Sequence, residues 1–182
     1  MKVYRIEKET VSWEVGDVIA PSFDERIYSD RRLKAESLLE NVRKSHYPYL
    51  YSRGNSLFVF PADDKLEERA FHWASTYAPL PDSSCVVSLL ELEVDNVEWH
   101  DSRNYEDLCF LLSGFKCGMR DITANEDDLC KKYWVGKCNM EEFSIEGLVS
   151  KARVIGIVPY INGSLKFEIT AKRLYAASQR VL

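Results

Sequence analysis

The chain lacks the motifs that mark the commonest metal and phosphate sites. Its five cysteines are separated by 24, 8, 13 and 8 positions, so no CxxC pair is present. This spacing fits neither a zinc knuckle nor a secreted disulfide framework. Neither GxGxxG nor GxxxxGK[ST] occurs, which excludes dinucleotide and P-loop binding of the usual kinds. We therefore expect reduced thiols with structural roles and no bound metal.

Long apolar runs are also missing. No stretch approaches the roughly 18 apolar residues that a membrane-spanning helix needs. The segment MKVYRIEKETVSW at the start contains no apolar core of a secretory signal. The sequence predicts a soluble, cytoplasmic protein with no membrane partner.

Positive charge is in the minority. Twenty-four Lys and Arg residues face 29 Asp and Glu residues, which gives a formal net charge of −5. Extended nucleic-acid binding relies on clustered Lys and Arg, so we do not expect it here. The 182 residues, 46% of them hydrophobic, are enough for one domain with its own core, and we expect a single domain over residues 1–182.

Hydrophobic periodicity predicts an α+β fold. Helices are predicted at residues 29–45, 63–77 and 103–113, where apolar residues recur at helical spacing. Strands are predicted at 2–6, 16–21, 56–61, 85–94, 132–136, 152–158 and 165–170, with a hairpin turn at 162–164. The pattern indicates helices concentrated in the N-terminal half and a closing meander of strands, hence a layered, mostly antiparallel sheet with helices packed on it.

Three polar residues interrupt or flank apolar strands in this pattern. Arg5 lies within KVYRI, Ser56 opens SLFVF, and Glu146 precedes ARVIGIV. An arginine binds phosphate or pyrophosphate through its two-pronged guanidinium. A serine can hydrogen-bond a sugar hydroxyl, and a carboxylate can stabilise positive charge developing on a sugar ring. Meeting in one sheet, these groups would form a nucleotide-binding cleft.

The order arginine, serine, glutamate on successive strands resembles the ADP-ribosyltransferases of the R-S-E type. The segment Glu146-Gly147-Leu148-Val149, followed by a strand, is similar to their glutamate segment, and YSRGNSLFVFP, VEWHDS and YWVG are similar to a family of uncharacterised bacterial proteins. The resemblance implies the ADP-ribosyltransferase-like split sheet. It also implies that NAD is held by Arg5 and Ser56, while Glu146 supports the loss of nicotinamide. Arginine-specific members carry Glu or Gln two residues before the catalytic glutamate, where this chain has Ser144. The acceptor is therefore left open.

Further residues are candidates for the same site. Arg53 lies in the turn SRGNS, whose backbone N–H groups can cradle an anion. Tyr133, Trp134 and Tyr77 are candidates to stack on nicotinamide, and His100 is a candidate substrate contact.

Two other functions fit the same residues. One is a non-catalytic module of this fold that binds a nucleotide or a protein. The other is a small hydrolase built on Glu98, His100 and Asp101, which stand together in EWHDS and could act as acid and base.

Overall fold

The computed structural model describes residues 1–8, 12–21, 29–66, 68–70, 87–114, 124–136, 138–140 and 144–160. Contacts between residues divide the chain into two compact units. Unit 1 comprises Met1–Ile19, Phe58–Asn96 and Lys151–Leu182, and unit 2 comprises Ala20–Leu57 and Val97–Ser150. The expectation of a single domain over residues 1–182 stays a prediction.

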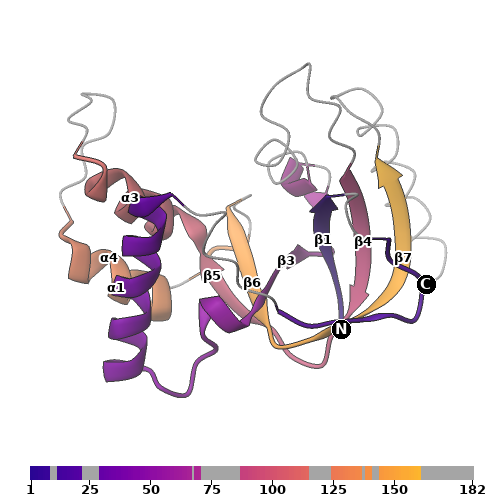
Figure 1. The fold of residues 1–182 in the computed structure, drawn as a ribbon, viewed down its shortest axis with the longest axis horizontal. Helices are drawn as coiled ribbons and strands as arrows, with labels where there is room; N and C mark the ends of the chain where they lie inside the picture. Colours follow the sequence, from indigo (N-terminus) through magenta and orange to yellow (C-terminus); the bar gives the residue numbers. More distant parts are fainter. Residues whose placement is uncertain are drawn as a thin grey trace. The chain divides into compact units, whose positions relative to one another are not determined.

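Unit 1 is built on an antiparallel sheet. Its strands follow the order β2-β7-β4-β1-β3, and each described pairing between neighbours is antiparallel. Figure 1 shows β1, β4 and β7 side by side. The bounds are β1 (Lys2–Lys8), β2 (Val18–Ile19), β3 (Leu57–Pro61), β4 (Val87–Glu93) and β7 (Ala152–Tyr160).

The centre of this sheet is covered on both faces. Val3 and Tyr4 are neighbours in β1, so their side chains point to opposite faces, and both are buried. Across the ladder, Val3 pairs with Leu92 and Ile6 with Leu89, which are also buried.

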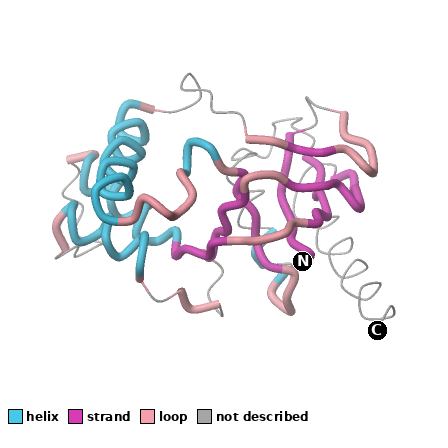
Figure 2. Tube along the Cα trace, turned by 90° about the horizontal axis from the view of Figure 1, so that it is seen from below, coloured by secondary structure: helices cyan, strands magenta, loops and turns pink. Residues whose placement is uncertain are grey.

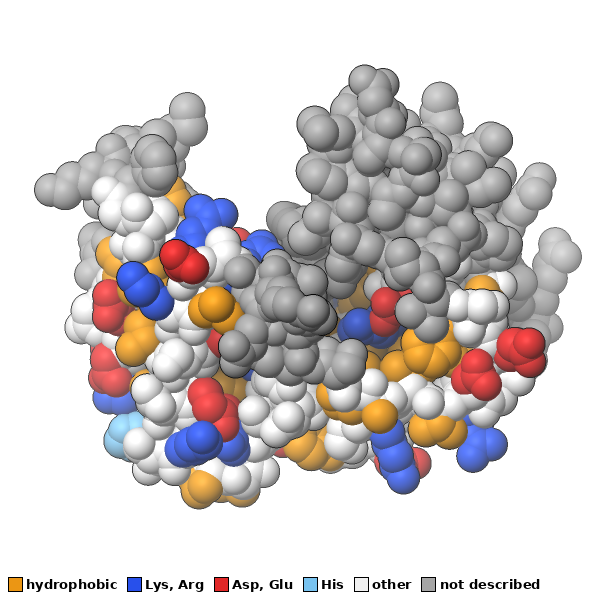
Figure 3. Space-filling model, viewed as in Figure 1, with side chains coloured by type: hydrophobic (Ala, Val, Ile, Leu, Met, Phe, Trp, Pro, Cys, Tyr) orange, Lys and Arg blue, Asp and Glu red, His pale blue; other side chains and the backbone are white. Residues whose placement is uncertain are grey.

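Unit 2 combines three packed helices with a strand pair. Helices α1 (Asp30–His46), α3 (Ser102–Leu112) and α4 (Glu126–Val135) contact one another, and Figures 1 and 2 show them as one group. Strand β5 (Glu98–Asp101) pairs antiparallel with β6 (Ile145–Val149), and the short 3-10 turn η2 (Arg53–Asn55) precedes β3. On the face that Figure 3 shows, positive and negative side chains lie interspersed over the helical unit.

The fold confirms the predicted α+β class with antiparallel strands. The helices at 29–45 and 103–113 are α1 and α3, and the strands at 2–6, 56–61, 85–94 and 152–158 are β1, β3, β4 and β7. The predicted 16–21 strand is the two-residue β2. Of the helix at 63–77, Leu66 and residues 68–70 are helical and residues 63–65 form a bend and turn, while residues 67 and 71–77, including Tyr77, lie outside the described residues. The hairpin turn at 162–164 and the strand at 165–170 also lie outside them.

The predicted strand at 132–136 is wrong. These residues form the end of α4 and its C-terminal glycine. The Asn125 side chain caps the helix by accepting a hydrogen bond from the backbone N–H of Asp128, 2.9 Å away, and three acidic residues fill the first turn. Capping and favourable charge at the helix N-terminus outweigh the strand preference of the Tyr-Trp-Val run.

The predicted distribution of elements is also corrected. Helices α3 and α4 both follow residue 100, so the described helices are not concentrated in the N-terminal half. Strand β6 pairs with β5, and β7 pairs with β2 and β4, so these late strands do not form a meander. Local pattern shows an element's type, whereas pairing between distant strands depends on contacts that the local pattern does not contain. None of the described helices is long and apolar enough to cross a membrane.

Candidate functional site

Glu146 lies inside a strand of its own. It is the second residue of β6 and only 2% exposed, so it lies in a strand that the sequence did not predict, ahead of the one that begins at Ala152. The adjacent Gly147 explains the unusual pair of residues. A Cβ there would lie 2.6 Å from the ring of Trp99 and 2.5 Å from Val97 Cγ1, so only glycine fits against these side chains. Because neighbouring residues of a strand face opposite sides, this packing directs Glu146 away from Trp99.

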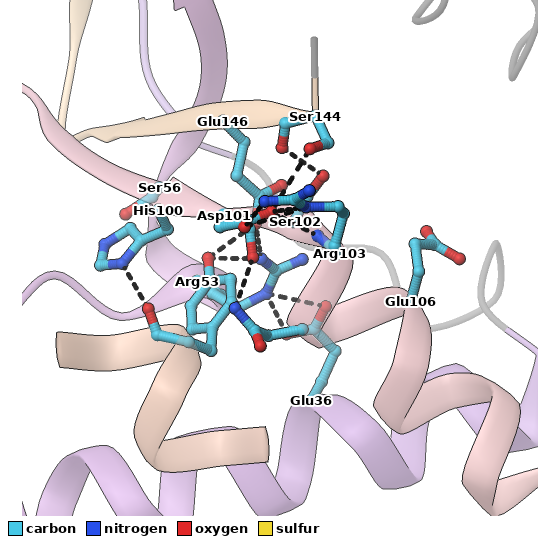
Figure 4. Close-up of polar contacts among 12 residues, drawn as sticks. Glu36, Arg53, Ser56, His100, Asp101, Ser102, Arg103, Glu106, Ser144 and Glu146 are labelled. Atoms are coloured by element: carbon cyan, nitrogen blue, oxygen red, sulfur yellow. Dashed lines mark hydrogen bonds and ion pairs between the residues drawn. The ribbon is translucent and has the colours of Figure 1, made fainter. Parts of the chain in front are cut away.

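Arg53 is the direct partner of Glu146. Its Nη1 donates to Glu146 Oε1 and, at 2.5 Å, to the Tyr133 hydroxyl. The Tyr133 hydroxyl in turn donates to Glu146 Oε1 at 2.7 Å. The three side chains come from η2, α4 and β6, and all three are buried. Figure 4 shows Arg53 and Glu146 pointing toward each other.

A second carboxylate shares the same guanidinium. Glu36, on α1, accepts from Arg53 Nε at 3.0 and 3.2 Å, and the guanidinium carbon lies 4.2 Å from the ring centre of Tyr105 on α3. One arginine therefore lies between two carboxylates and over an aromatic face, an arrangement that suits the planar, weakly hydrated guanidinium.

Burial and charge act in opposite directions on these groups. Burial raises the pKa of Glu146, and the Arg53 charge and the Tyr133 hydroxyl oppose this, leaving the pKa above its ordinary value. Burial also raises the pKa of Tyr133, so its hydroxyl keeps its proton and serves as a donor. The two carboxylates outweigh burial at Arg53 and raise its pKa well above its ordinary value, so it stays charged.

The two oxygens of Glu146 differ in their contacts. Both bonds from Arg53 and Tyr133 fall on Oε1, and no hydrogen bond to Oε2 forms among the described residues. A carboxylate with one oxygen held and the other unbonded is oriented and still able to accept a hydrogen bond from a ligand.

The remaining predicted residues of the NAD site have local partners. Ser56 is buried, and its hydroxyl donates to the Ser52 carbonyl at 2.7 Å, which closes the η2 turn that carries Arg53. Arg5 belongs to unit 1, where its Nη1 donates to the Phe58 carbonyl at 2.9 Å and its Nε to Glu7. The structure thus brings together Arg53, Tyr133 and Glu146, with Ser56 as a support of the turn.

His100 adjoins this cluster. It is the cross-strand partner of Glu146, and its ring stacks on that of Tyr133 with 4.8 Å between centroids. Glu98 Oε2 lies 4.0 Å from His100 Nε2. Asp101 instead caps α3 by accepting from the backbone N–H of Arg103 at 3.0 Å. The three residues of the hydrolase alternative are thereby divided into a pair and a helix cap.

A cavity of about 340 Å³ opens beside α1 in the same unit. Glu36, Glu40, Ser52, Arg53 and Trp134 are among its lining residues. Its polar wall includes one face of the Arg53 cluster. In the described part of the chain, no group of three or more His, Cys, Asp or Glu side chains is placed to hold a metal ion.

Sequence reasoning missed Glu36 and Tyr105. Glu36 stands three residues after Leu33 and three before Leu39, on the helix face that also carries the buried Leu39. A carboxylate at such a position was the available signal. Tyr105 on α3 carried no such signal, because an aromatic among buried Leu108 and Cys109 is ordinary core.

No family model matches this chain, and no curated protein matches its sequence.

Proposed function

We propose that the chain is an NAD-dependent ADP-ribosyltransferase in which Glu146 is the catalytic carboxylate. The observation that carries the proposal is the state of this side chain. It is buried, its Oε1 is held by Arg53 and Tyr133, and its Oε2 accepts no hydrogen bond from the described residues. Buried ionisable groups with strong partners and a shifted pKa gather at functional sites.

In this proposal Glu146 acts through its second oxygen. Oε2 accepts a hydrogen bond from a hydroxyl of the nicotinamide-ribose. As the bond from C1′ to nicotinamide breaks, the carboxylate stabilises the positive charge that develops on the ribose ring. The bonding electrons leave with nicotinamide, and the acceptor then attacks C1′.

Arg53 and Tyr133 are positioning residues in this proposal. They fix the rotamer of Glu146 through Oε1, and the guanidinium favours the ionised carboxylate that the reaction needs. This differs from the sequence-based expectation that Arg53 and Tyr133 contact NAD themselves, because both side chains are engaged with Glu146.

The roles of Arg5 and Ser56 in NAD binding stay predictions from the sequence. Each is tested by the affinity for NAD of the alanine variant. Loss of binding in Arg5→Ala with Glu146→Gln still able to bind would support the implied division of roles.

The decisive experiment measures NAD binding by calorimetry and free nicotinamide in the same samples. The wild-type chain is compared with Glu146→Gln, which keeps the shape and removes the charge. Glu106→Gln is the control, since Glu106 is 53% exposed in the same unit and lies 3.9 Å from Arg32. We expect Glu146→Gln to lower nicotinamide release about 100-fold or more, with NAD affinity within roughly threefold of wild type. Equal release by wild type and Glu146→Gln would refute the proposal.

A second candidate is a non-catalytic module that binds NAD or a related nucleotide. The ion pair between Arg53 and Glu146 favours it, because a neutralised carboxylate supports a developing cation less strongly. NAD binding without any release of nicotinamide by the wild-type chain would select this candidate.

A further inference from the structure

The imidazole of His100 carries an unsatisfied acceptor. The side chain is 4% exposed. Its Nδ1 lies 3.0 Å from the backbone carbonyl oxygen of Tyr133, which can only accept, so Nδ1 carries the proton and Nε2 carries a lone pair. Nε2 is buried and has no hydrogen-bond partner among the described residues. A buried acceptor without a donor is costly and indicates that something else supplies the donor.

A second acceptor lies close to Nε2. Glu98 Oε2 lies 4.0 Å from His100 Nε2, and the Glu98 side chain is 19% exposed, more than that of His100. The backbone N–H of Tyr51 donates to this oxygen at 2.7 Å. The neighbouring Arg43 is committed elsewhere, since it donates to both oxygens of Glu40 and to the Leu50 carbonyl.

No Lys or Arg side chain of the described residues lies within 4.0 Å of the Glu98 carboxylate. Burial raises the pKa of this carboxyl, and the Arg43 charge opposes the increase from farther away. Burial lowers the pKa of His100 to about 4, so the imidazole supplies no positive charge at neutral pH. The two side chains thus present a lone pair on His100 and a carboxylate oxygen on Glu98.

We propose that this pair of acceptors binds a primary ammonium group. Two acceptors require a group that donates at least twice, which a single hydroxyl cannot do. Consider an ammonium nitrogen about 2.85 Å from both His100 Nε2 and Glu98 Oε2, which are 4.0 Å apart. The angle at this nitrogen between the two acceptors is about 90°, so two N–H bonds of one ammonium can reach both. The anionic carboxylate favours a cation over a neutral amide or water. The site goes beyond the proposed function and does not depend on it.

Nuclear magnetic resonance of the ¹⁵N-histidine-labelled chain tests this directly, because the Nε2 chemical shift reports whether the lone pair accepts a hydrogen bond. Methylammonium is the probe, and tetramethylammonium is the control cation without N–H groups. Glu98→Gln removes the charge, while its amide oxygen still accepts from the Tyr51 N–H, and Glu106→Gln is the matched exposed control. We expect a saturable shift of the His100 Nε2 signal with methylammonium alone. Its affinity should fall about tenfold or more in Glu98→Gln and stay unchanged in Glu106→Gln.

Several results would overturn the site. An Nε2 signal that methylammonium leaves unchanged would show that no ammonium binds and would leave a water molecule as the donor. Equal responses to both cations, or full affinity in Glu98→Gln, would show non-specific attraction. Where the site holds, putrescine and Nα-acetyl-lysine methylamide distinguish its source. Tighter binding of putrescine identifies a free polyamine, and tighter binding of the lysine derivative identifies a protein side chain.

Discussion

Replacing Arg53 by methionine should destabilise the chain severely. The guanidinium is the common partner of Glu36 and Glu146, and its side chain is 6% exposed. Methionine fills much of the same volume but leaves Glu146 buried without its cation. Removing one partner of a buried ion pair costs about 3–5 kcal/mol. For a chain of this length, that corresponds to a fall in Tm of roughly 10 °C.

The loss should depend on pH. Without Arg53, burial raises the pKa of Glu146 further, so the folded chain holds this proton at pH values where the unfolded chain has lost it. Stability contributed by such a group is present below the unfolded pKa and is lost as pH rises through the folded pKa. The deficit of Arg53→Met should therefore be smaller near pH 4 and grow toward pH 7.5.

Urea unfolding at both pH values measures this deficit. Arg103→Met is the control, since Arg103 is 47% exposed and pairs with Asp101 at 2.6 Å, and removing an exposed pair costs about 1 kcal/mol or less. The double variant Arg53→Met with Glu146→Gln should lose less than the sum of the two single variants. A deficit in Arg53→Met no larger than that in Arg103→Met, or one independent of pH, would refute the reasoning.

Three further outcomes are expected. Gly147→Ala should cost about 1–3 kcal/mol in urea unfolding, because its Cβ would collide with the Trp99 ring, and unchanged stability would contradict the packing described. In an NMR titration, the ring of His100 should stay neutral until the pH falls to its pKa of about 4. Since unfolded histidine takes up its proton near pH 6.5, stability should fall by roughly 3 kcal/mol as pH drops through that window, and a pKa near 6.5 would show that the ring is not buried. Asn125→Ala should cost about 1 kcal/mol by removing the N-cap of α4, and a neutral effect would show that the cap contributes little.

Local pattern was sufficient for most of the described elements. The spacing of Ala35 and Leu39 predicts α1, and both residues are buried in the structure. The error at α4 arose because the Tyr-Trp-Val run favours a strand by composition. The helix is set instead by Asn125 and the acidic residues of its first turn. Boundaries that depend on a cap are missed when only apolar spacing is read.

Several members of the site were predictable from the sequence, but Glu36, Tyr105 and the connections between the residues were not. Arg53, Tyr133, His100 and Glu146 were named from the sequence as candidates. Their bonds join residues 80 and 93 positions apart, a relation that no local pattern contains. Arg53 was expected to contribute to an NAD site, and its guanidinium instead binds the Glu146 carboxylate.

The most direct test of the central claim is a crystal structure of the chain with carba-NAD, an analogue that does not release nicotinamide. The account expects a nicotinamide-ribose hydroxyl about 2.5–2.7 Å from Glu146 Oε2, with Oε1 still held by Arg53 and Tyr133. A complex in which Oε2 contacts no part of the ligand, or crystals that take up no ligand at saturating concentration, would contradict Glu146 as the catalytic carboxylate.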